Sequence, residues 1–142
     1  MTPLFKKLNL KDQKEIVVLG APSSFEPELA ALTDATGVTV HRSLDVPGDI
    51  SFALAFVLDQ ASLEKTVPEL TRRAVGDATV WSAYPKLSSK RYTSDLNRDE
   101  GWVSLSEAGF RPVRSVAIDE DWSGVRFRRV EYVKSSGRSP KS

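Results

Sequence analysis

Short apolar runs with the length of β-strands recur along the chain between segments of helical periodicity. The clearest run is residues 15–20, Glu-Ile-Val-Val-Leu-Gly, which is continuous and ends in glycine. Such a run is typical of a strand buried on both faces of a parallel sheet. The same reasoning predicts six strands, at residues 15–20, 38–42, 50–58, 78–83, 113–118 and 125–133.

Apolar residues at helical spacing lie between several of these strands. One predicted helix begins near Ser23, which forms a capping-box pattern with Glu26, and ends at Gly37. A second helix follows residue 59, and Pro68 places its regular part near Thr66, with the proline in its first turn. Further helical segments are expected at residues 3–14, where the turn is short, and at residues 97–109, where Asn97 and Glu100 provide a cap and Trp102, Leu105 and Ala108 line one face.

The order of these elements predicts the fold class. Residues 119–124 join the last two strands and are too few for a crossover helix, so this pair should be antiparallel. Alternating strands and helices before it indicate an α/β fold, a three-layer Rossmann-like mostly parallel sheet ending in an antiparallel hairpin. We expect one domain over residues 1–134 and a disordered tail over residues 135–142, which contain only Ser, Gly, Arg, Pro and Lys.

Composition excludes several classes of function. The chain has 142 residues and a net charge of +1, which argues against a global attraction to nucleic acid or to an acidic membrane. It has no cysteine and one histidine, His41, so thiolate chemistry and a multi-histidine metal site are excluded, and we expect no metal. No run is long enough to span a membrane and no secretory signal is present, so a cytoplasmic location is expected.

Two resemblances refine the expected fold. The sheet resembles a shortened methyltransferase Rossmann fold, and residues 105–113 resemble its helix-to-strand join before the terminal hairpin. The chain also resembles a bacterial family known as a domain of unknown function. The segments that carry this second resemblance cover most of the chain and are residues 3–8, 21–25, 84–86, 93–96 and 119–124. It implies the α/β fold and no particular activity.

The most informative candidate site follows the strand at residues 78–83. In an open α/β sheet, ligands bind beyond the carboxyl ends of the strands. Here Tyr84, whose hydroxyl could orient a ligand, leads into a loop of cations and hydroxyls, which are the groups that bind phosphate or carboxylate. These loop residues are Lys86, Ser88, Ser89, Lys90 and Arg91. The alternative is a solvated polar loop beside an ordinary strand tyrosine.

Other candidate residues are expected at the same edge of the sheet. Ser23 and Ser24 follow the first strand at a helix N-terminus, a weak anion site or a plain cap. Asp59 follows the third strand and could accept a hydrogen bond from a ligand or cap a helix. Residues 20–24 lack the glycine spacing of a dinucleotide or adenosylmethionine loop, and the second strand ends in His41-Arg42 rather than an acid. The cofactor therefore stays unspecified.

Three functional hypotheses remain open at this point. The first is a protein that binds an anionic small molecule at the carboxyl edge, because no nucleophile or cofactor motif is present. The second is a degenerate or minimal methyltransferase-like transferase, from the order of the elements. The third is a protein-interaction subunit, which could use Trp102 or an exposed edge strand; such an edge also makes a homodimer a hypothesis. No catalytic residue is assigned.

Overall fold

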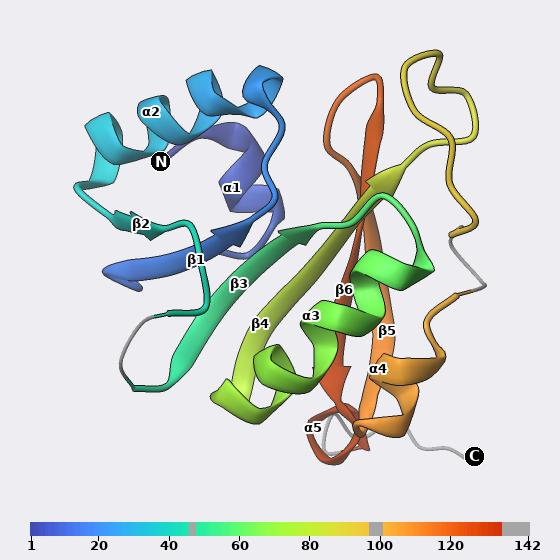
Figure 1. The fold of residues 1–142 in the computed structure, drawn as a ribbon. Coiled ribbons are helices and arrows are strands. Elements are labelled where there is room, and N and C mark those ends of the chain that lie inside the picture. The colour runs from blue at the N-terminus through green and yellow to red at the C-terminus, as the bar shows by residue number, and fades with distance from the viewer. Residues whose placement is uncertain (46–47, 97–100, 135–142) are drawn as a thin grey trace.

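The computed structural model describes residues 1–45, 48–96 and 101–134, which form one six-stranded sheet with helices on both faces (Figure 1). The strands are β1 (Glu15–Leu19), β2 (Thr39–His41), β3 (Ile50–Phe56), β4 (Ala74–Pro85), β5 (Phe110–Ala117) and β6 (Trp122–Arg129). The helices are α1 (Pro3–Lys7), α2 (Glu26–Thr36), α3 (Gln60–Arg73), α4 (Val103–Glu107) and α5 (Val130–Lys134), and a short 3-10 turn (Ser23–Phe25) precedes α2.

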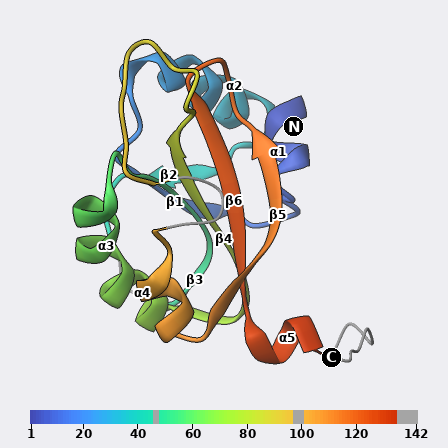
Figure 2. The same ribbon diagram turned by 90° about the vertical axis from the view of Figure 1, so that its right-hand side faces the viewer.

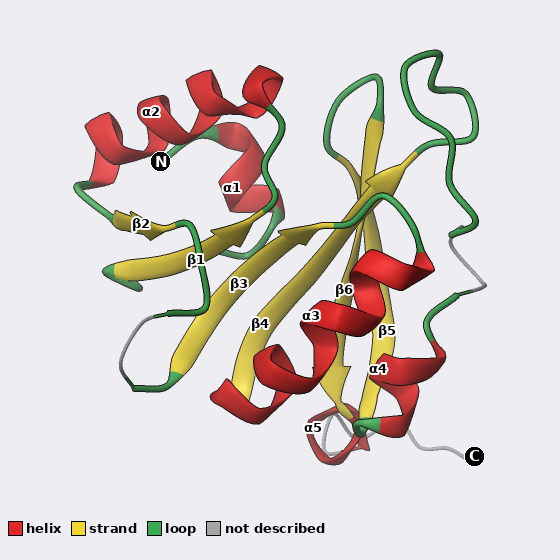
Figure 3. Ribbon diagram, in the orientation of Figure 1, coloured by secondary structure: helices red, strands yellow, loops and turns green. Residues whose placement is uncertain are grey.

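The sheet is mixed in the way that the sequence predicts. Its strand order is β2-β1-β3-β4-β6-β5 (Figure 3). β1 pairs in parallel with β2 and β3, and β3 pairs in parallel with β4. β6 lies between β4 and β5 and is antiparallel to both. The predicted α/β class with a terminal antiparallel hairpin is confirmed.

Each face of the sheet has its own hydrophobic core. Figure 2 shows α1 and α2 on one side of the sheet and α3 and α4 on the other. Phe5 of α1 and Leu29 of α2 pack with alternate residues of β3 and β4, among them the fully buried Trp81. The opposite core contains Leu63 of α3 and Leu105 of α4. Apolar burial on both faces explains why the central strands are nearly continuous apolar runs.

α3 begins earlier than the sequence predicts. The helix starts at Gln60 after an Asp59 cap and contains Pro68 in its interior, so the predicted start near Thr66 is wrong. A proline inside a helix removes one backbone hydrogen bond and costs about 3 kcal/mol. Four buried residues of α3, Leu63, Val67, Leu70 and Thr71, pack on the sheet and offset that cost.

The ends of several other elements also differ from the prediction. β4 begins at Ala74 and β5 at Phe110, both earlier than expected. The predicted last strand to residue 133 is wrong, because its partner β5 begins at Phe110, which pairs with Arg129. No residue of β5 is left to pair beyond this point, and α5 follows. The predicted Asn97–Glu100 cap lies outside the described residues, and so does the expected tail at 135–142.

Candidate functional site

The carboxyl ends of β1, β3 and β4 meet at one edge of the sheet, as parallel strands must (Figure 1). The chain leaves β1 at this edge and returns as β2, which lies on one side of β1 in the sheet. β3 and β4 lie on the other side of β1. The strand order therefore reverses between β1 and β3, and this is where open α/β sheets usually hold a ligand. The predicted site residues lie on the connections that leave these strands.

The chain leaves β1 in close contact with the end of the neighbouring strand β3. Gly20 has a φ of +67°, and a Cβ atom at this position would lie 2.8 Å from the carbonyl oxygen of Phe56. The ring of Phe56 lies 4.9 Å from that of Phe25 and 5.1 Å from that of Trp122, measured between centroids. All three rings are buried. The chain's own aromatic side chains thus pack beside the switch point on the α2 side of the sheet.

An ion pair joins the first residue of α2 to the residue that follows β2. Arg42 donates hydrogen bonds of 2.5 and 2.8 Å to the two carboxylate oxygens of Glu26, and this pairing lowers the pKa of Glu26. Ser23 and Ser24 are exposed in the 3-10 turn. No side chain caps this turn or α2, so the predicted capping box at Ser23 is wrong. The backbone first forms a 3-10 turn, which moves the start of α2 to Glu26.

Asp59 acts as the helix cap of α3, one of the two roles that the sequence left open. Its Oδ1 accepts hydrogen bonds of 2.9 Å from both the backbone nitrogen and the hydroxyl of Ser62. These bonds lower the pKa of Asp59, the backbone bond most strongly. Asp95 joins the same helix end, because its Oδ1 accepts a 2.8 Å hydrogen bond from the Gln60 backbone nitrogen. Two carboxylates therefore occupy the helix end where an anion would otherwise bind.

Tyr84 belongs to the core rather than to the loop that follows it. Its side chain is 7% exposed, and its ring packs edge-on against Trp102 at 5.6 Å between centroids. It lies in the core beneath α3 and α4. The structure thus separates Tyr84 from the cations that follow it in sequence.

The cationic loop, defined as residues 86–91, is tied to the turn between β5 and β6. The Lys86 backbone nitrogen donates to the Asp121 carbonyl oxygen at 2.8 Å, and the Ser89 hydroxyl donates to Asp121 Oδ1 at 2.9 Å. Ser89 Oγ in turn accepts 3.2 Å bonds from the backbone nitrogens of Arg91 and Tyr92. Asp121 and Ser89 therefore fix the backbone of this loop, which the sequence had also allowed to be a simple solvated segment.

The cations of the loop differ in their surroundings. Arg91 Nε lies 3.8 Å from Asp121 Oδ2, and 68% of the Arg91 side chain is exposed. Lys90 and Ser88 are exposed, and Lys86 is half-buried. The neighbouring turn also carries Asp119 and Glu120, whose negative charges balance part of this positive charge. The structure thus brings Ser89 and Arg91 together on Asp121.

Two carboxylates at this edge were not identified as site residues from the sequence. Asp121 was considered only as part of the connection between the last two strands and of a family resemblance, and Asp95 only as part of that resemblance. Each accepts hydrogen bonds from a segment more than 30 residues away in sequence. Sequence periodicity reports local structure, so it carries no signal for such long-range contacts.

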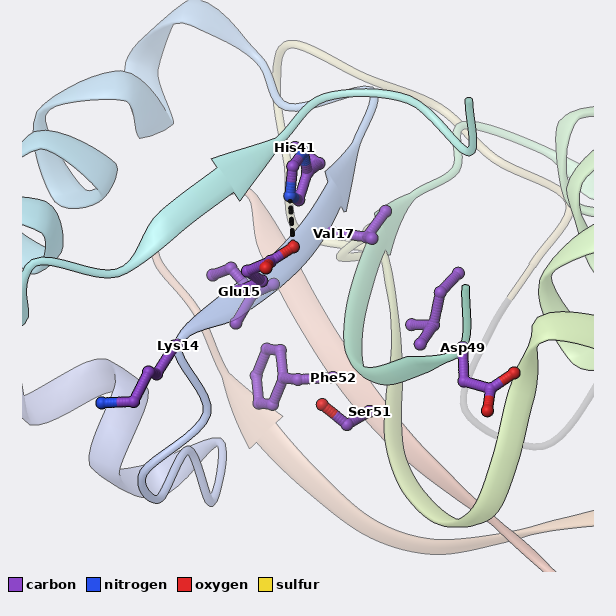
Figure 4. A pocket seen from close by; sticks show the side chains of 9 residues that line it. Lys14, Glu15, Val17, His41, Asp49, Ser51 and Phe52 are labelled. Carbon is purple, nitrogen blue, oxygen red and sulfur yellow. Dashed lines mark hydrogen bonds and ion pairs between the residues drawn. The ribbon is translucent and has the colours of Figure 1, made fainter. Parts of the chain in front are cut away.

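A separate cavity lies at the opposite, amino edge of β1 and β3 and has a volume of about 310 Å³ (Figure 4). Its lining includes Glu15, His41, Asp49 and Ser51. Glu15 Oε1 and His41 Nε2 form a 2.9 Å contact across it. His41 thus contacts a carboxylate on the neighbouring strand β1.

Metal-binding clusters and membrane-spanning helices are both absent from the part of the chain that the structure describes. Within residues 1–45, 48–96 and 101–134, no group of three or more histidine or carboxylate side chains is arranged to hold a metal ion. In the same residues, no helix has both the length and the apolar character needed to cross a membrane.

Comparison with solved structures identifies the fold. The chain is similar to an SAM-dependent methyltransferase from Aquifex aeolicus, with 18% identity and a TM-score of 0.62 over 89% of this chain and 88% of that chain. It is also similar to the N-methyltransferase NodS from Bradyrhizobium japonicum, with 13% identity and a TM-score of 0.57 over 89% and 92%. A third neighbour is magnesium protoporphyrin IX methyltransferase from Synechocystis PCC 6803 with bound SAM, with 10% identity and a TM-score of 0.56 over 89% and 74%.

Sequence comparison gives no comparable match. No family model matches the chain, and no curated protein matches it. The resemblance to a bacterial family of unknown function therefore stays a prediction. At these low identities the structural likeness establishes the fold and no activity. The chain has a methyltransferase-like Rossmann fold.

Proposed function

We propose that this chain is a binding protein built on a methyltransferase-like fold, and that it holds an anionic small molecule at the cationic loop. The observation that carries this proposal is the hydrogen bonding of Ser89 and Asp121, which fixes the loop backbone. A loop that is ordered before binding loses less conformational entropy when the ligand arrives. This order favours a binding role over a simple solvated connection.

The side chains of the loop supply the chemistry for an anion. Lys86, Lys90 and Arg91 carry three positive charges within six residues. The 3.8 Å separation of Arg91 from Asp121 is beyond hydrogen-bonding distance, so the guanidinium keeps its donors for a ligand. Its planar fork matches the oxygens of a phosphate or carboxylate. Because the acidic turn weakens the long-range field, we expect direct contacts with a multiply charged ligand such as a diphosphate.

A methyltransferase-like transferase is the second candidate, and the fold of the solved neighbours supports it. The residues at the switch point fit an adenosylmethionine cofactor poorly. The buried rings of Phe25 and Phe56 pack beside the switch point, and Pro22 lacks an amide donor in the turn after β1. Arg42, bound to Glu26, stands where a ribose-binding enzyme of this class has an acid. We therefore derive no reaction step through that cofactor.

Calorimetric titration with pyrophosphate tests the binding proposal. We expect saturable binding to the wild-type protein and about tenfold weaker binding to Arg91→Ala, because a charge-assisted hydrogen bond contributes about 1.5 kcal/mol or more. Arg72→Ala is the matched control. Arg72 also pairs with a carboxylate, Glu69, and its side chain is 67% exposed against 68% for Arg91.

The same titration can reject the proposal. Equal losses of affinity in Arg91→Ala and Arg72→Ala would show that the anion responds only to overall charge. An absence of heat with pyrophosphate, in a sample that circular dichroism shows to be folded, would remove the anion site altogether.

A further inference from the structure

A second cationic region lies on the sheet itself, away from the cationic loop. We name it the arginine face, and it consists of Arg111 and Arg114 on β5 with Arg126 and Arg128 on β6. Arg114 is directly opposite Arg126, and Arg111 is directly opposite Arg128. Residues opposed in this way on antiparallel strands point to the same side, with Cβ atoms about 5 Å apart. Four guanidinium groups therefore share a small area of one face.

This face is on the side of the sheet that carries α1. Arg126 pairs across strands with Trp81, whose indole packs in the core beneath α1 and α2. Figure 2 shows the lower parts of β5 and β6 on that side, with α1 above and α5 below, and without a described helix over them. The arginine face is thus an open part of the sheet surface.

Negative charges balance only part of the positive charge of the arginine face. Arg128 donates hydrogen bonds of 2.8 and 2.7 Å to the two carboxylate oxygens of Asp77, and this pair lowers the pKa of Asp77. Among the described residues, Arg111, Arg114 and Arg126 have no carboxylate within ion-pair distance. Like charges that face each other across two strands destabilise a sheet. Two such opposed pairs, Arg111 with Arg128 and Arg114 with Arg126, are present in this sheet.

Arg126 shows the lack of compensation most directly. Its side chain is partly buried, and its Nε atom has no hydrogen-bond partner within the described parts of the chain. Burial lowers the pKa of Arg126 and the charge of Arg128 lowers it further, whereas the charge of Asp77 opposes this shift and that of Arg114 adds to it. A desolvated guanidinium without a full set of acceptors is costly, and an external anion would supply the missing acceptors.

Protection of the edge strand β5 explains only the two arginines of the arginine face that lie on that strand. Charged side chains, a proline and a bulge prevent an edge strand from pairing with other chains. Arg111, Pro112 and the irregular register before Arg114 on the edge strand β5 fit that role. Arg126 and Arg128 do not, because β6 is paired on both sides.

Positive charge continues from this face toward α1. The Trp81 indole nitrogen donates a 2.7 Å hydrogen bond to the Leu8 carbonyl oxygen and so places the end of α1 beside the strand that pairs with Arg126. Lys6 and Lys7 form the last turn of this helix and are exposed, and Lys11 is exposed just after it. Three exposed lysines thus lie on or just after the helix that packs on the same side of the sheet as the arginine face.

We propose that the arginine face binds the phosphate backbone of a nucleic acid without reading its base sequence. Two successive pairs of opposed arginines, with exposed lysines on the helix on the same side of the sheet, match a polymer of phosphates better than one small anion, and arginine forms bidentate contacts with phosphate. Trp81, the aromatic residue opposite Arg126, is fully buried and offers no ring for base stacking. The net charge of +1 gives no sign of this face, because acidic residues elsewhere in the chain balance its positive charge.

Fluorescence anisotropy with a labelled single-stranded RNA and a labelled DNA duplex tests this proposal. We expect saturable binding at low salt, and about fivefold or greater weakening in Arg114→Gln and in Arg126→Met. Each substitution should also reduce the slope of log K against log salt by about one. Arg72→Gln on α3 and Arg91→Ala in the cationic loop should bind as the wild type does, which separates this face from the site proposed above.

Thermal unfolding distinguishes lost contacts from lost structure. Because Arg126→Met removes a poorly compensated charge, we expect its melting temperature to equal or exceed that of the wild type while its binding falls. Arg114→Gln, at an exposed position, provides the same test if Arg126→Met does not fold. The proposal is wrong if neither nucleic acid binds at low salt, or if Arg72→Gln weakens binding as much as Arg114→Gln. Tighter binding of a polyglutamate peptide at equal ionic strength would instead assign the face to an acidic protein.

Discussion

At the scale of single residues, Gly20 follows β1 and lies close to the last residue of β3, Phe56. Its φ is +67°, and a methyl group there would meet the Phe56 carbonyl oxygen at 2.8 Å. We expect Gly20→Ala to lower the free energy of unfolding by about 2 kcal/mol or more, because backbone strain and a steric clash both contribute. Urea denaturation measures this change.

Gly37→Ala is the control for that substitution. Gly37 also has a positive φ, of +75°, and a Cβ there would have no atom within 4 Å. We expect it to cost only about 1 kcal/mol, from the backbone conformation alone. Equal effects of the two substitutions would show that the contact between Gly20 and Phe56 is not tight.

At the scale of elements, α3 contains a proline where a helix former would be more stable. Pro68→Ala should restore the backbone hydrogen bond that proline cannot donate. Proline also lowers the conformational entropy of the unfolded chain, so the expected net gain in the free energy of unfolding is about 2 kcal/mol. Pro27→Ala is the matched control, because Pro27 lies in the first turn of α2, where proline is tolerated. A gain in Pro27→Ala as large as that in Pro68→Ala would contradict this explanation.

The elements also show what the sequence could and could not predict. Continuous apolar runs such as β1 and β3 indicated buried parallel strands, and the short 119–124 connection indicated the antiparallel pair. The start of α3 was missed because Pro68 was given more weight than the Asp59 cap. The order of the strands, the docking of Ser89 on Asp121 and the opposed arginines depend on pairing between distant segments, which local patterns do not encode.

At the scale of the whole molecule, the methyltransferase-like fold supplies a carboxyl edge where the chain's own side chains pack beside the switch point between β1 and β3. Phe25, Phe56 and Trp122 form a row of buried rings beside it. The two proposed binding surfaces are the cationic loop, which follows β4 at this same edge, and the arginine face on β5 and β6. The fold therefore serves as a scaffold, and its charged surfaces carry the proposed functions.

Titration of the protein with adenosylmethionine, followed by backbone amide chemical shifts, distinguishes a binding scaffold from a methyltransferase. We expect no saturable shift at residues 20–24 or at Phe56 with millimolar adenosylmethionine, whereas pyrophosphate should shift the amides of residues 86–91. Saturable shifts at Gly20 and Phe56 with adenosylmethionine would show that the binding proposal is wrong and would favour the methyltransferase-like alternative.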